Sequence, residues 1–420
     1  MKKLLLFTDG FPYVVDERTF ILPELEYLIK EYEITIVSCA GIKVKEDAGN
    51  ITQLDPRIHN LFLNSKNTFR ERCFYAARAL FSVAWWQEAM DIIKTRKKIA
   101  ARLMYAFRYH VLADRYRRMI LQEGLLGGEP TIAYTFWNKA YTLSLVWLKE
   151  IFPNLKVVSR IHGHDLYNER VKESGRQAYK KYMDMRTEAI FFICEEGYHY
   201  YLNHFAQGKE MPDYYVLRLG VSRKENRNPR NASGVFELVS CSNVIPLKRV
   251  NRIIEGLALL PYGYKIRWVH FGDGSAMEDV KKLAEELLGH RQDISYEFRG
   301  FCQNETVMEY YCHTPIDCFI TTTSNEGLPV SIMEALSFGI PVIAPDVNGI
   351  AEEVENNYNG MLLSSEAEAG EVADAVMKFL EASEKQIEVF RENAYQMWEQ
   401  KYDKEKNVKE FMETLAKYAD

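Results

Sequence analysis

The chain has 420 residues, too many for one ordinary hydrophobic core, so we expect two domains of roughly 200 residues each. Hydrophobic residues make up 47% and charged residues 27%, which is typical of a water-soluble globular protein. The net charge of -6 argues against nucleic acid as a partner, because a phosphate backbone requires a basic protein.

The first residues look only briefly like a signal peptide. The apolar run Leu4–Phe7 ends at Thr8-Asp9-Gly10, and no later stretch approaches 18 uninterrupted apolar residues. The seven cysteines are an odd number scattered through apolar segments, which is typical of reduced thiols in a cytoplasmic protein. Cys302, Cys312, His313 and Cys318 lie close together, but their spacing fits no zinc pattern, so we expect structural thiols and no metal.

Short apolar, β-rich runs alternate with longer amphipathic segments along nearly the whole chain. This alternation predicts parallel sheets with helices on both faces. The strands expected in the first half are Lys3–Thr8, Glu33–Ser38, Thr131–Phe136, Lys156–Ile161, Ala189–Cys194 and Tyr214–Leu219. Those expected in the second half are Phe236–Ser242, Ile266–Gly272, Ile294–Gly300, Cys318–Thr323 and Pro341–Ala344.

The rhythm breaks at Ser222–Gly234, a polar, turn-rich stretch that we interpret as a linker. The predicted fold class is therefore α/β, with a Rossmann-like domain over residues 1–221 and a second one over 235–400. We expect a ligand cleft between them, beyond the carboxyl ends of the strands. Residues 401–420 are predicted to form a C-terminal helix that can cross back to the first domain.

Residues 66–120 contain no convincing strand, and their charge is lopsided. Thirteen Lys and Arg side chains face only four Asp and Glu, a local net charge of +9, and ten Phe, Trp and Tyr side chains are interleaved. Basic, aromatic helices suit an anionic membrane surface, here the inner face of a plasma membrane. Ordinary solvated helices whose aromatic side chains pack on the first domain explain the same pattern, and both interpretations stay open.

The most informative stretch is residues 321–345, TTTSNEGLPVSIMEALSFGIPVIAP. A strand end and a polar turn lead to Pro329, a suitable first helical residue, and Gly339 stops the helix. The helix would point its free N–H groups at the turn Glu326-Gly327-Leu328, where a diphosphate could bind.

Two carboxylates flank this helix start. Glu334 lies eight residues after Glu326, among apolar neighbours, and helical side chains lean back toward the N-terminus. Such a pair suits the hydroxyl groups of a sugar and a ribose. A capping Glu and a solvated helical Glu would give the same spacing.

Several segments in order complete a recognisable pattern. They are the Glu-x7-Glu stretch with Ala335-Leu-Ser-Phe-Gly-Ile-Pro341, Val239–Arg249 (VSCSNVIPLKR), His270–Gly274 (HFGDG), Phe298–Phe301 (FRGF), Ser159–Asp165 (SRIHGHD) and Leu219-Gly-Val221. This pattern resembles the family 4 glycosyltransferases, retaining enzymes of the GT-B fold in which two Rossmann-like domains face each other across a cleft.

The resemblance implies a role for each matching residue. Lys248 would neutralise the donor diphosphate, Glu334 would hold the ribose, Glu326 would bind the hexose, and His162 would lie over the sugar. The other residues expected on the donor side are Asn243, Arg249, Gly272, Gly300, Phe301, Gly327 and Leu328, and those expected on the acceptor side are Gly10 and Asp165.

Some positions depart from the family pattern or have a simpler explanation. Asn243 stands where the family often has an Arg, and the first loop, Asp9–Tyr13, is not glycine-rich. His162 ends an apolar strand at the edge where ligands bind, whereas His164 suits an ordinary loop. Asp165 suits a helix cap or turn acceptor.

The resemblance implies transfer of a hexosyl-type group from a nucleotide-diphosphate sugar to a glycan or lipid-linked glycan, in cell-surface polysaccharide assembly. We expect no cofactor and no metal, because no Asp-x-Asp motif accompanies the donor segment.

Three alternatives remain. A GT-B relative could act as an epimerase or a phosphorylase, although nothing marks a cofactor lysine. A nicotinamide oxidoreductase would need a third glycine after Gly272-Asp-Gly274, and the sequence lacks it. A non-catalytic protein that binds sugar nucleotides is the third.

Overall fold

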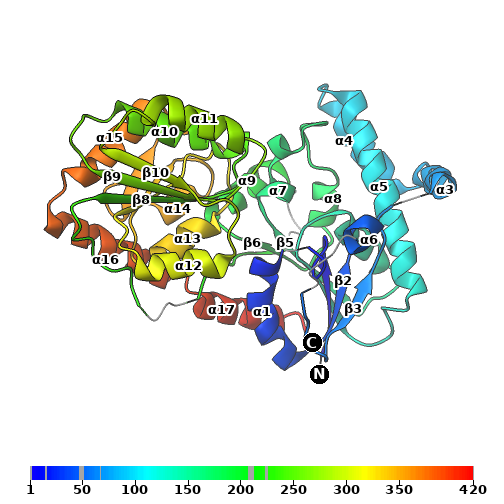
Figure 1. Ribbon diagram of the computed structural model, residues 1–420. Helices are drawn as coiled ribbons and strands as arrows, with labels where there is room; N and C mark the ends of the chain where they lie inside the picture. The colour runs from blue at the N-terminus through cyan, green and yellow to red at the C-terminus, as the bar shows by residue number, and fades with distance from the viewer. Residues whose placement is uncertain are drawn as a thin grey trace. The chain divides into compact units, whose positions relative to one another are not determined.

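The computed structural model describes residues 2–14, 17–46, 52–66, 68–206, 212–222 and 226–419 (Figure 1). Contacts divide the chain into unit 1, which is Met1–Leu217 with Val408–Asp420, and unit 2, which is Arg218–Asn407. Each unit contains one all-parallel sheet with helices in its connections, so the predicted class of two Rossmann-like α/β domains is confirmed. The sequence predicts domain boundaries after residues 221 and 400, and the boundaries between the two units follow residues 217 and 407.

The sheet of unit 1 has the strand order β3-β2-β1-β4-β5-β6-β7. Its strands are β1 Lys2–Thr8, β2 Tyr32–Ser38, β3 His59–Phe62, β4 Thr131–Thr135, β5 Leu155–Ile161, β6 Ala189–Phe192 and β7 Asp213–Val216. Its helices are α1 Arg18–Glu31, α2 Ile42–Glu46, α3 Phe69–Ala79, α4 Val83–Lys94, α5 Ile99–Gln122, α6 Ala140–Leu148, α7 Gly163–Leu166, η1 Asn168–Arg170, α8 Lys180–Asp184 and α9 Glu195–His204, with α17 Lys404–Ala416 returning to it.

Strand β1 shows why this sheet is covered on both faces. Leu5 and Phe7 belong to one hydrophobic cluster, whereas Leu4 and Leu6 belong to another. Successive side chains of a strand point to opposite faces, so a continuous apolar run requires apolar cover on each side. The sequence missed β3, a four-residue edge strand whose first two residues are exposed and which carries no long apolar run.

A buried ion pair helps to hold the C-terminal segment on unit 1. The Arg160 guanidinium on β5 contacts the Glu24 carboxylate on α1 and lies 4.8 Å from the centre of the Phe411 ring. Phe411 and Leu415 of α17 are buried in the same cluster as Leu4. The predicted return of the C-terminal helix to the first domain is therefore confirmed.

The sheet of unit 2 has the strand order β10-β9-β8-β11-β12-β13. Its strands are β8 Phe236–Cys241, β9 Ile266–Phe271, β10 Ile294–Phe298, β11 Cys318–Ile320, β12 Val342–Pro345 and β13 Gly360–Leu363. Its helices are η2 Pro246–Lys248, α10 Val250–Leu259, α11 Met277–Leu288, α12 Asn304–His313, α13 Val330–Ser337, α14 Ile350–Glu353, α15 Ala369–Leu380 and α16 Glu384–Lys401. The sequence missed the four-residue strand β13.

The stretch interpreted as a linker, Ser222–Gly234, falls within unit 2, and its residues 223–225 lie outside the described part. Asn228 in this stretch is buried. Its Nδ2 donates to the carbonyl oxygens of Tyr311 at 2.6 Å and Thr314 at 2.8 Å, and its Oδ1 accepts from the N–H of Ile316. This polar side chain thus fastens the stretch to the end of α12.

The buried ring of His270 on β9 makes stability depend on pH. Nδ1 of His270 lies 2.8 Å from the Ser240 hydroxyl, and burial lowers the His270 pKa from 6.5 to about 4. As the pH falls below 6.5, the unfolded chain gains a proton that the folded chain excludes, so this site destabilises the fold progressively down to pH 4.

We expect His270→Gln to lessen this loss of stability on acidification. The full effect of the wild-type histidine amounts to about 3 kcal/mol. Urea unfolding at about pH 7.5 and about pH 5 measures the free energy of unfolding of wild type and variant. At about pH 7.5 the histidine is neutral in the folded and unfolded states, so the difference between the two proteins there is the packing cost of the substitution. The attribution to His270 would be wrong if wild type and variant lost equal stability between the two pH values.

Candidate functional site

The residues proposed for donor binding lie in loops at one edge of the unit 2 sheet. Carboxyl ends of parallel strands meet at the same edge, and the loops after β8, β9, β10 and β11 all leave from there. The loops also bond to one another: Val244 N–H donates to the Asp273 carbonyl at 2.9 Å, and Gly272 N–H donates to the Gly300 carbonyl at 2.8 Å.

Helix α13 begins at this edge and offers unused hydrogen-bond donors. Pro329, which the sequence predicted as the first helical residue, is its N-cap residue, so the helix begins one position later than expected. Gly339, with a φ of +71°, follows its end. Among the described residues, the backbone N–H groups of Gly327, Leu328, Val330 and Ser331 have no hydrogen-bond partner. Four such donors at the positive end of a helix dipole form a binding site for an anion.

Lys248 lies at the same helix start. Its ammonium group contacts the Glu326 carboxylate, and each side chain is about one-fifth exposed. The N–H of Ser324 donates to the Leu247 carbonyl at 2.9 Å, and the Thr322 hydroxyl donates to the Arg249 carbonyl at 2.8 Å. These bonds hold the loop after β11 against η2, so the structure brings Lys248, Glu326 and the start of α13 together.

Arg249 bonds to the loop after β11 and to the loop after β13. Its guanidinium donates to the carbonyl oxygens of Thr322, Thr323, Ser365 and Glu366 at 2.7 to 3.0 Å. Its backbone adopts a φ of +49° just before α10. The described contacts of Arg249 therefore fix loops that carry the site.

Glu334 is 7% exposed and lies on the first turns of α13. Its Oε1 accepts a hydrogen bond from Nδ2 of Asn304 at 2.6 Å. Burial, reinforced by the Glu334 charge, raises the pKa of Cys241 to about 12, so this thiol stays protonated. Glu334 thus lies deeper than Glu326, as expected for a helical carboxylate that leans toward the turn.

Gly272 is required by its surroundings. It adopts a φ of +139°, and a Cβ atom there would lie 1.9 Å from the Ser242 carbonyl oxygen. Gly300, paired with it, has a φ of +65°. Asn243 and Phe301 are exposed at the same edge, and their contact with a donor stays a prediction.

In unit 1, a carboxylate that the sequence analysis overlooked organises the first loop. Glu17 accepts hydrogen bonds from the N–H groups of Asp9 at 3.1 Å, Gly10 at 2.7 Å and Phe11 at 2.6 Å, and from Trp137 Nε1 at 2.5 Å. Gly10 is buried, and a Cβ atom there would approach Val14 Cγ2 to 2.5 Å. The only sequence signal was an acidic residue just before a helix.

His162 lies buried at the carboxyl end of β5. Its ring is 4.4 Å from the Trp137 ring and 4.8 Å from the Phe136 ring, centre to centre. Burial, with Arg160 nearby, lowers the His162 pKa well below its usual range, so the ring is neutral. Its Nε2 is buried and has no hydrogen-bond partner within the described part of the chain, an arrangement that needs an explanation.

Asp165 acts on the backbone around His162. Its carboxylate is buried, and its two oxygens accept from the N–H groups of His162 at 2.8 Å and Asn138 at 2.5 Å. These bonds agree with the cap or turn interpretation. Contact between Asp165 and an acceptor stays a prediction.

Two lysines of unit 1 lie beside these residues and were not singled out from the sequence. Lys139 contacts the Asp9 carboxylate, and the buried Lys180 donates to Oδ1 of Asn138 at 2.7 Å. Burial lowers the pKa of Lys180 to about 7. These contacts join residues that lie 42 to 130 positions apart, so no local pattern could reveal them.

The cysteines are free thiols, as expected. Within the described ranges, no group of three or more His, Cys, Asp and Glu side chains is arranged to hold a metal ion.

Comparison with known proteins gives these loops a context. Residues 222–397 match the family model described as glycosyl transferases group 1. This region is therefore similar to group 1 glycosyl transferases, and it contains every residue expected on the donor side.

Two curated relatives align with part of the chain. The amylovoran biosynthesis glycosyltransferase AmsK of Erwinia amylovora is 25% identical over 214 residues, which cover 49% of this chain and 51% of AmsK. The lipopolysaccharide 1,6-galactosyltransferase of Salmonella typhimurium is 25% identical over 232 residues, which cover 51% of this chain and 63% of that enzyme. The chain thus spans about half the length of AmsK and somewhat more of the second relative.

A solved structure shares the fold over nearly the whole chain. HepE of Anabaena, in complex with UDP and glucose, aligns with a TM-score of 0.65 at 15% identity and covers 99% of this chain and 100% of HepE. The two Rossmann-like units therefore form a GT-B fold.

Alanine at Gly272 should destabilise the fold more than alanine at Gly263, because only the first would collide with neighbouring backbone. Gly272→Ala combines an unfavourable φ with a collision against the Ser242 backbone, and we expect a loss of at least about 3 kcal/mol. Gly263 also has a positive φ, of +106°, but nothing lies within 4 Å of its hypothetical Cβ.

Gly263→Ala should therefore show the conformational cost alone, about 1 to 2 kcal/mol. Thermal melting of both variants provides the comparison. Equal melting temperatures for the two would contradict the close approach of Gly272 to Ser242.

Proposed function

We propose that this protein is a glycosyltransferase that moves a hexosyl-type group from a nucleotide-diphosphate sugar to a glycan or lipid-linked glycan acceptor. One observation carries the proposal: the Lys248 ammonium lies at the start of α13, where four backbone N–H groups have no partner among the described residues. A positive side chain and a helix N-terminus together suit the diphosphate of such a donor.

The role of Glu326 follows from its contact with Lys248. In the structure the carboxylate serves as the counter-ion of the ammonium group. An arriving diphosphate would compete for Lys248 and free the Glu326 oxygens to accept hydrogen bonds from sugar hydroxyls. Glu334, buried behind the helix start, would bind the ribose hydroxyls.

Departure of the diphosphate develops negative charge on the leaving oxygen. Lys248 and the N–H groups of Gly327 and Leu328 would stabilise this charge, and preorganised donors of this kind act most strongly where water is excluded. We propose that this stabilisation works without a metal ion.

We propose that the anomeric configuration is retained. In this route the acceptor hydroxyl attacks on the face from which the diphosphate leaves, and a diphosphate oxygen takes the hydroxyl proton. This route needs no protein nucleophile, so Glu326, once released from Lys248, would bind the sugar and form no covalent intermediate.

In unit 1, we propose that Nε2 of His162 binds a substrate hydroxyl. A buried ring nitrogen without a protein partner has an unfavourable free energy, which a hydroxyl group would relieve. The ring is neutral because of its lowered pKa, so one of its nitrogens can accept a hydrogen bond.

The similarity to AmsK and to the lipopolysaccharide galactosyltransferase supports a role in cell-surface polysaccharide assembly. HepE was solved with UDP and glucose, which makes UDP-hexoses the first donors to test. We place the protein in the cytoplasm.

A thermal-shift screen over nucleotide sugars, followed by a turnover assay, tests the proposed function. A donor that binds the folded protein at a hundred times its Kd stabilises it by about 2.7 kcal/mol. Binding without turnover would favour a non-catalytic protein, and an unchanged melting temperature with every donor would contradict the proposal.

Lys248→Ala should lower turnover by more than about 10²-fold and weaken the thermal shift by UDP, because the diphosphate loses its counter-charge. Lys281→Ala, on the exposed face of α11, is the matched control and should behave as wild type. His162→Ala should lower turnover but keep the UDP shift, since the UDP-binding groups belong to unit 2. Near-normal turnover of Lys248→Ala would remove this residue from the mechanism.

A further inference from the structure

Helix α4 has two apolar faces, whereas a surface helix normally has one. Trp85, Ala89 and Ile92 are buried in the core of unit 1. On the other side, Val83, Trp86, Met90 and Ile93 are 52% to 71% exposed. Their spacing of three, four and three residues places them in one row along the helix, which we call the α4 stripe.

Further exposed apolar side chains lie on the neighbouring elements of the basic segment. Phe81, which precedes α4, is 89% exposed. The others are Phe69, Phe74, Leu80, Ile99 and Met104. Several large apolar side chains exposed within one short segment indicate an interaction site.

A basic turn follows the stripe directly. Arg96, Lys97 and Lys98 join α4 to α5, and all three are exposed without an ion pair to any described residue. Lys94, the last residue of α4, lies 3.7 Å from Asp91 and is largely exposed. The basic turn (residues 94–98) therefore presents positive charge at the end of the apolar stripe.

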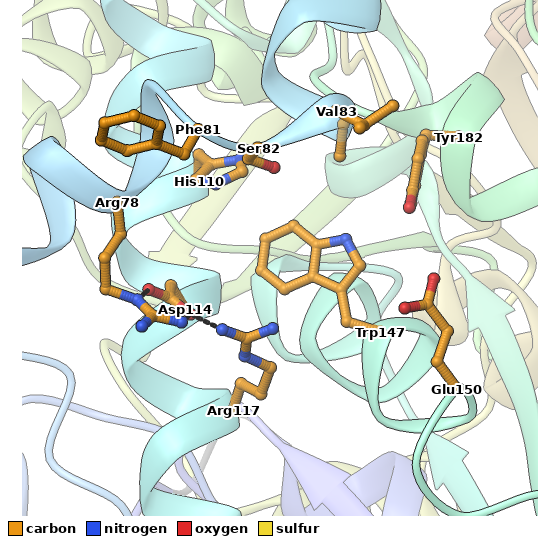
Figure 2. A pocket seen from close by; sticks show the side chains of 11 residues that line it. Arg78, Phe81, Ser82, Val83, His110, Asp114, Arg117, Trp147, Glu150 and Tyr182 are labelled. Carbon is orange, nitrogen blue, oxygen red and sulfur yellow. Dashed lines mark hydrogen bonds and ion pairs between the residues drawn. The ribbon is translucent and has the colours of Figure 1, made fainter.

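Other basic side chains of this segment are used internally. A pocket of about 490 Å³ lies beside the start of α4. Arg78 and Arg117, which line it, both pair with the buried Asp114 (Figure 2). The Arg117 guanidinium lies 5.5 Å from the centre of the Trp147 ring. Arg78 joins α3 to α5 through its contact with Asp114, whereas Arg117 pairs with Asp114 within α5. The two arginines share one carboxylate, so most of their charge is balanced inside the segment.

The stripe is held rigidly in place. The Trp85 ring packs edge-on against Phe107 of α5 with centres 5.3 Å apart, and the buried Glu88 accepts a hydrogen bond from Arg176 at 2.9 Å. Because α4 is anchored through its buried face, the exposed face keeps its arrangement without a partner. The surface is therefore preorganised.

We propose that the α4 stripe and the basic turn dock on the surface of an anionic lipid bilayer. Apolar side chains would enter the boundary between headgroups and acyl chains, while the Lys and Arg side chains would contact anionic headgroups. None of the helices in the described part of the chain has the length and apolar character needed to cross a bilayer, so α4 would lie along the surface.

Charge favours a bilayer over a second copy of the chain as the occupant. Residues 66–120 carry a net charge of +9 in a chain of -6, so two copies meeting through this segment would bring like charges together. An anionic surface attracts the same segment and orients it, because the rest of the chain is negative. This inference stands independently of the proposed transferase activity.

Vesicle flotation with the full chain tests the proposal. Wild type is expected to float with phosphatidylcholine vesicles that contain phosphatidylglycerol, to float much less with pure phosphatidylcholine, and to be released by salt. Trp86→Ser with Ile93→Ser should weaken binding on the order of 10-fold or more, and Lys94→Gln with Lys97→Gln and Lys98→Gln on the order of 10- to 100-fold.

Matched controls come from unit 2. Leu259 and Val389 are 61% and 52% exposed, so Leu259→Ser with Val389→Ser removes comparable apolar surface from a different place. Lys281→Gln with Lys282→Gln and Lys378→Gln removes three exposed positive charges from unit 2, as many as the basic-turn variant removes from unit 1. Both controls should float like wild type, and all variants should keep the wild-type melting temperature within a few degrees.

Two outcomes would overturn the proposal. Wild type that stays unbound on anionic vesicles would exclude docking, as would α4-stripe variants that float as well as wild type. Light scattering distinguishes a second copy of the chain as the occupant. The α4 stripe would be a dimer interface if wild type had twice the chain mass, did not float, and became monomeric in Trp86→Ser with Ile93→Ser.

Discussion

The ammonium group of Lys248, held against Glu326 where α13 begins, is the contact on which the functional interpretation depends. It exists because two loops at the carboxyl edge of the unit 2 sheet are bonded to each other through Leu247 and Ser324. Unused backbone N–H groups and the positive end of the helix dipole lie beside this cation among the described residues, so the site favours an anion. A ligand with two phosphate groups would complete it.

The two units serve different chemical needs. The site residues of unit 2 present backbone N–H groups and a cation, which suit phosphate. Those of unit 1 are a neutral histidine and carboxylates held in hydrogen bonds, which suit hydroxyl groups. This division parallels the match of residues 222–397 to group 1 glycosyl transferases, while the first unit is matched at the level of fold.

The sequence predicted most of the fold, because long apolar runs and helical spacing are local signals. It missed β3 and β13, which have four residues each and carry little pattern. The closeness of Lys248 and Glu326 came from a family resemblance, since 78 positions separate them. Glu17, Lys139 and Lys180 escaped notice because their roles arise from contacts between distant segments that spacing does not encode. The positive net charge of residues 66–120 can be read from the sequence. Only the structure shows that Arg78 pairs with the buried Asp114, whereas Lys97 is exposed and has no ion pair to a described residue.

Glu17 has a consequence for the kind of molecule that can approach the first loop. Its carboxylate already occupies the N–H groups of residues 9 to 11, and its pKa is raised by burial and by the neighbouring Asp9. An incoming group therefore finds these three amide donors already bonded to Glu17, while the Asp9 carboxylate beside them is paired with the Lys139 ammonium group. An anionic group would gain no amide donors from residues 9 to 11, whereas an uncharged alcohol could donate a hydrogen bond to a carboxylate of this loop. Selectivity for neutral partners would then be intrinsic to the loop.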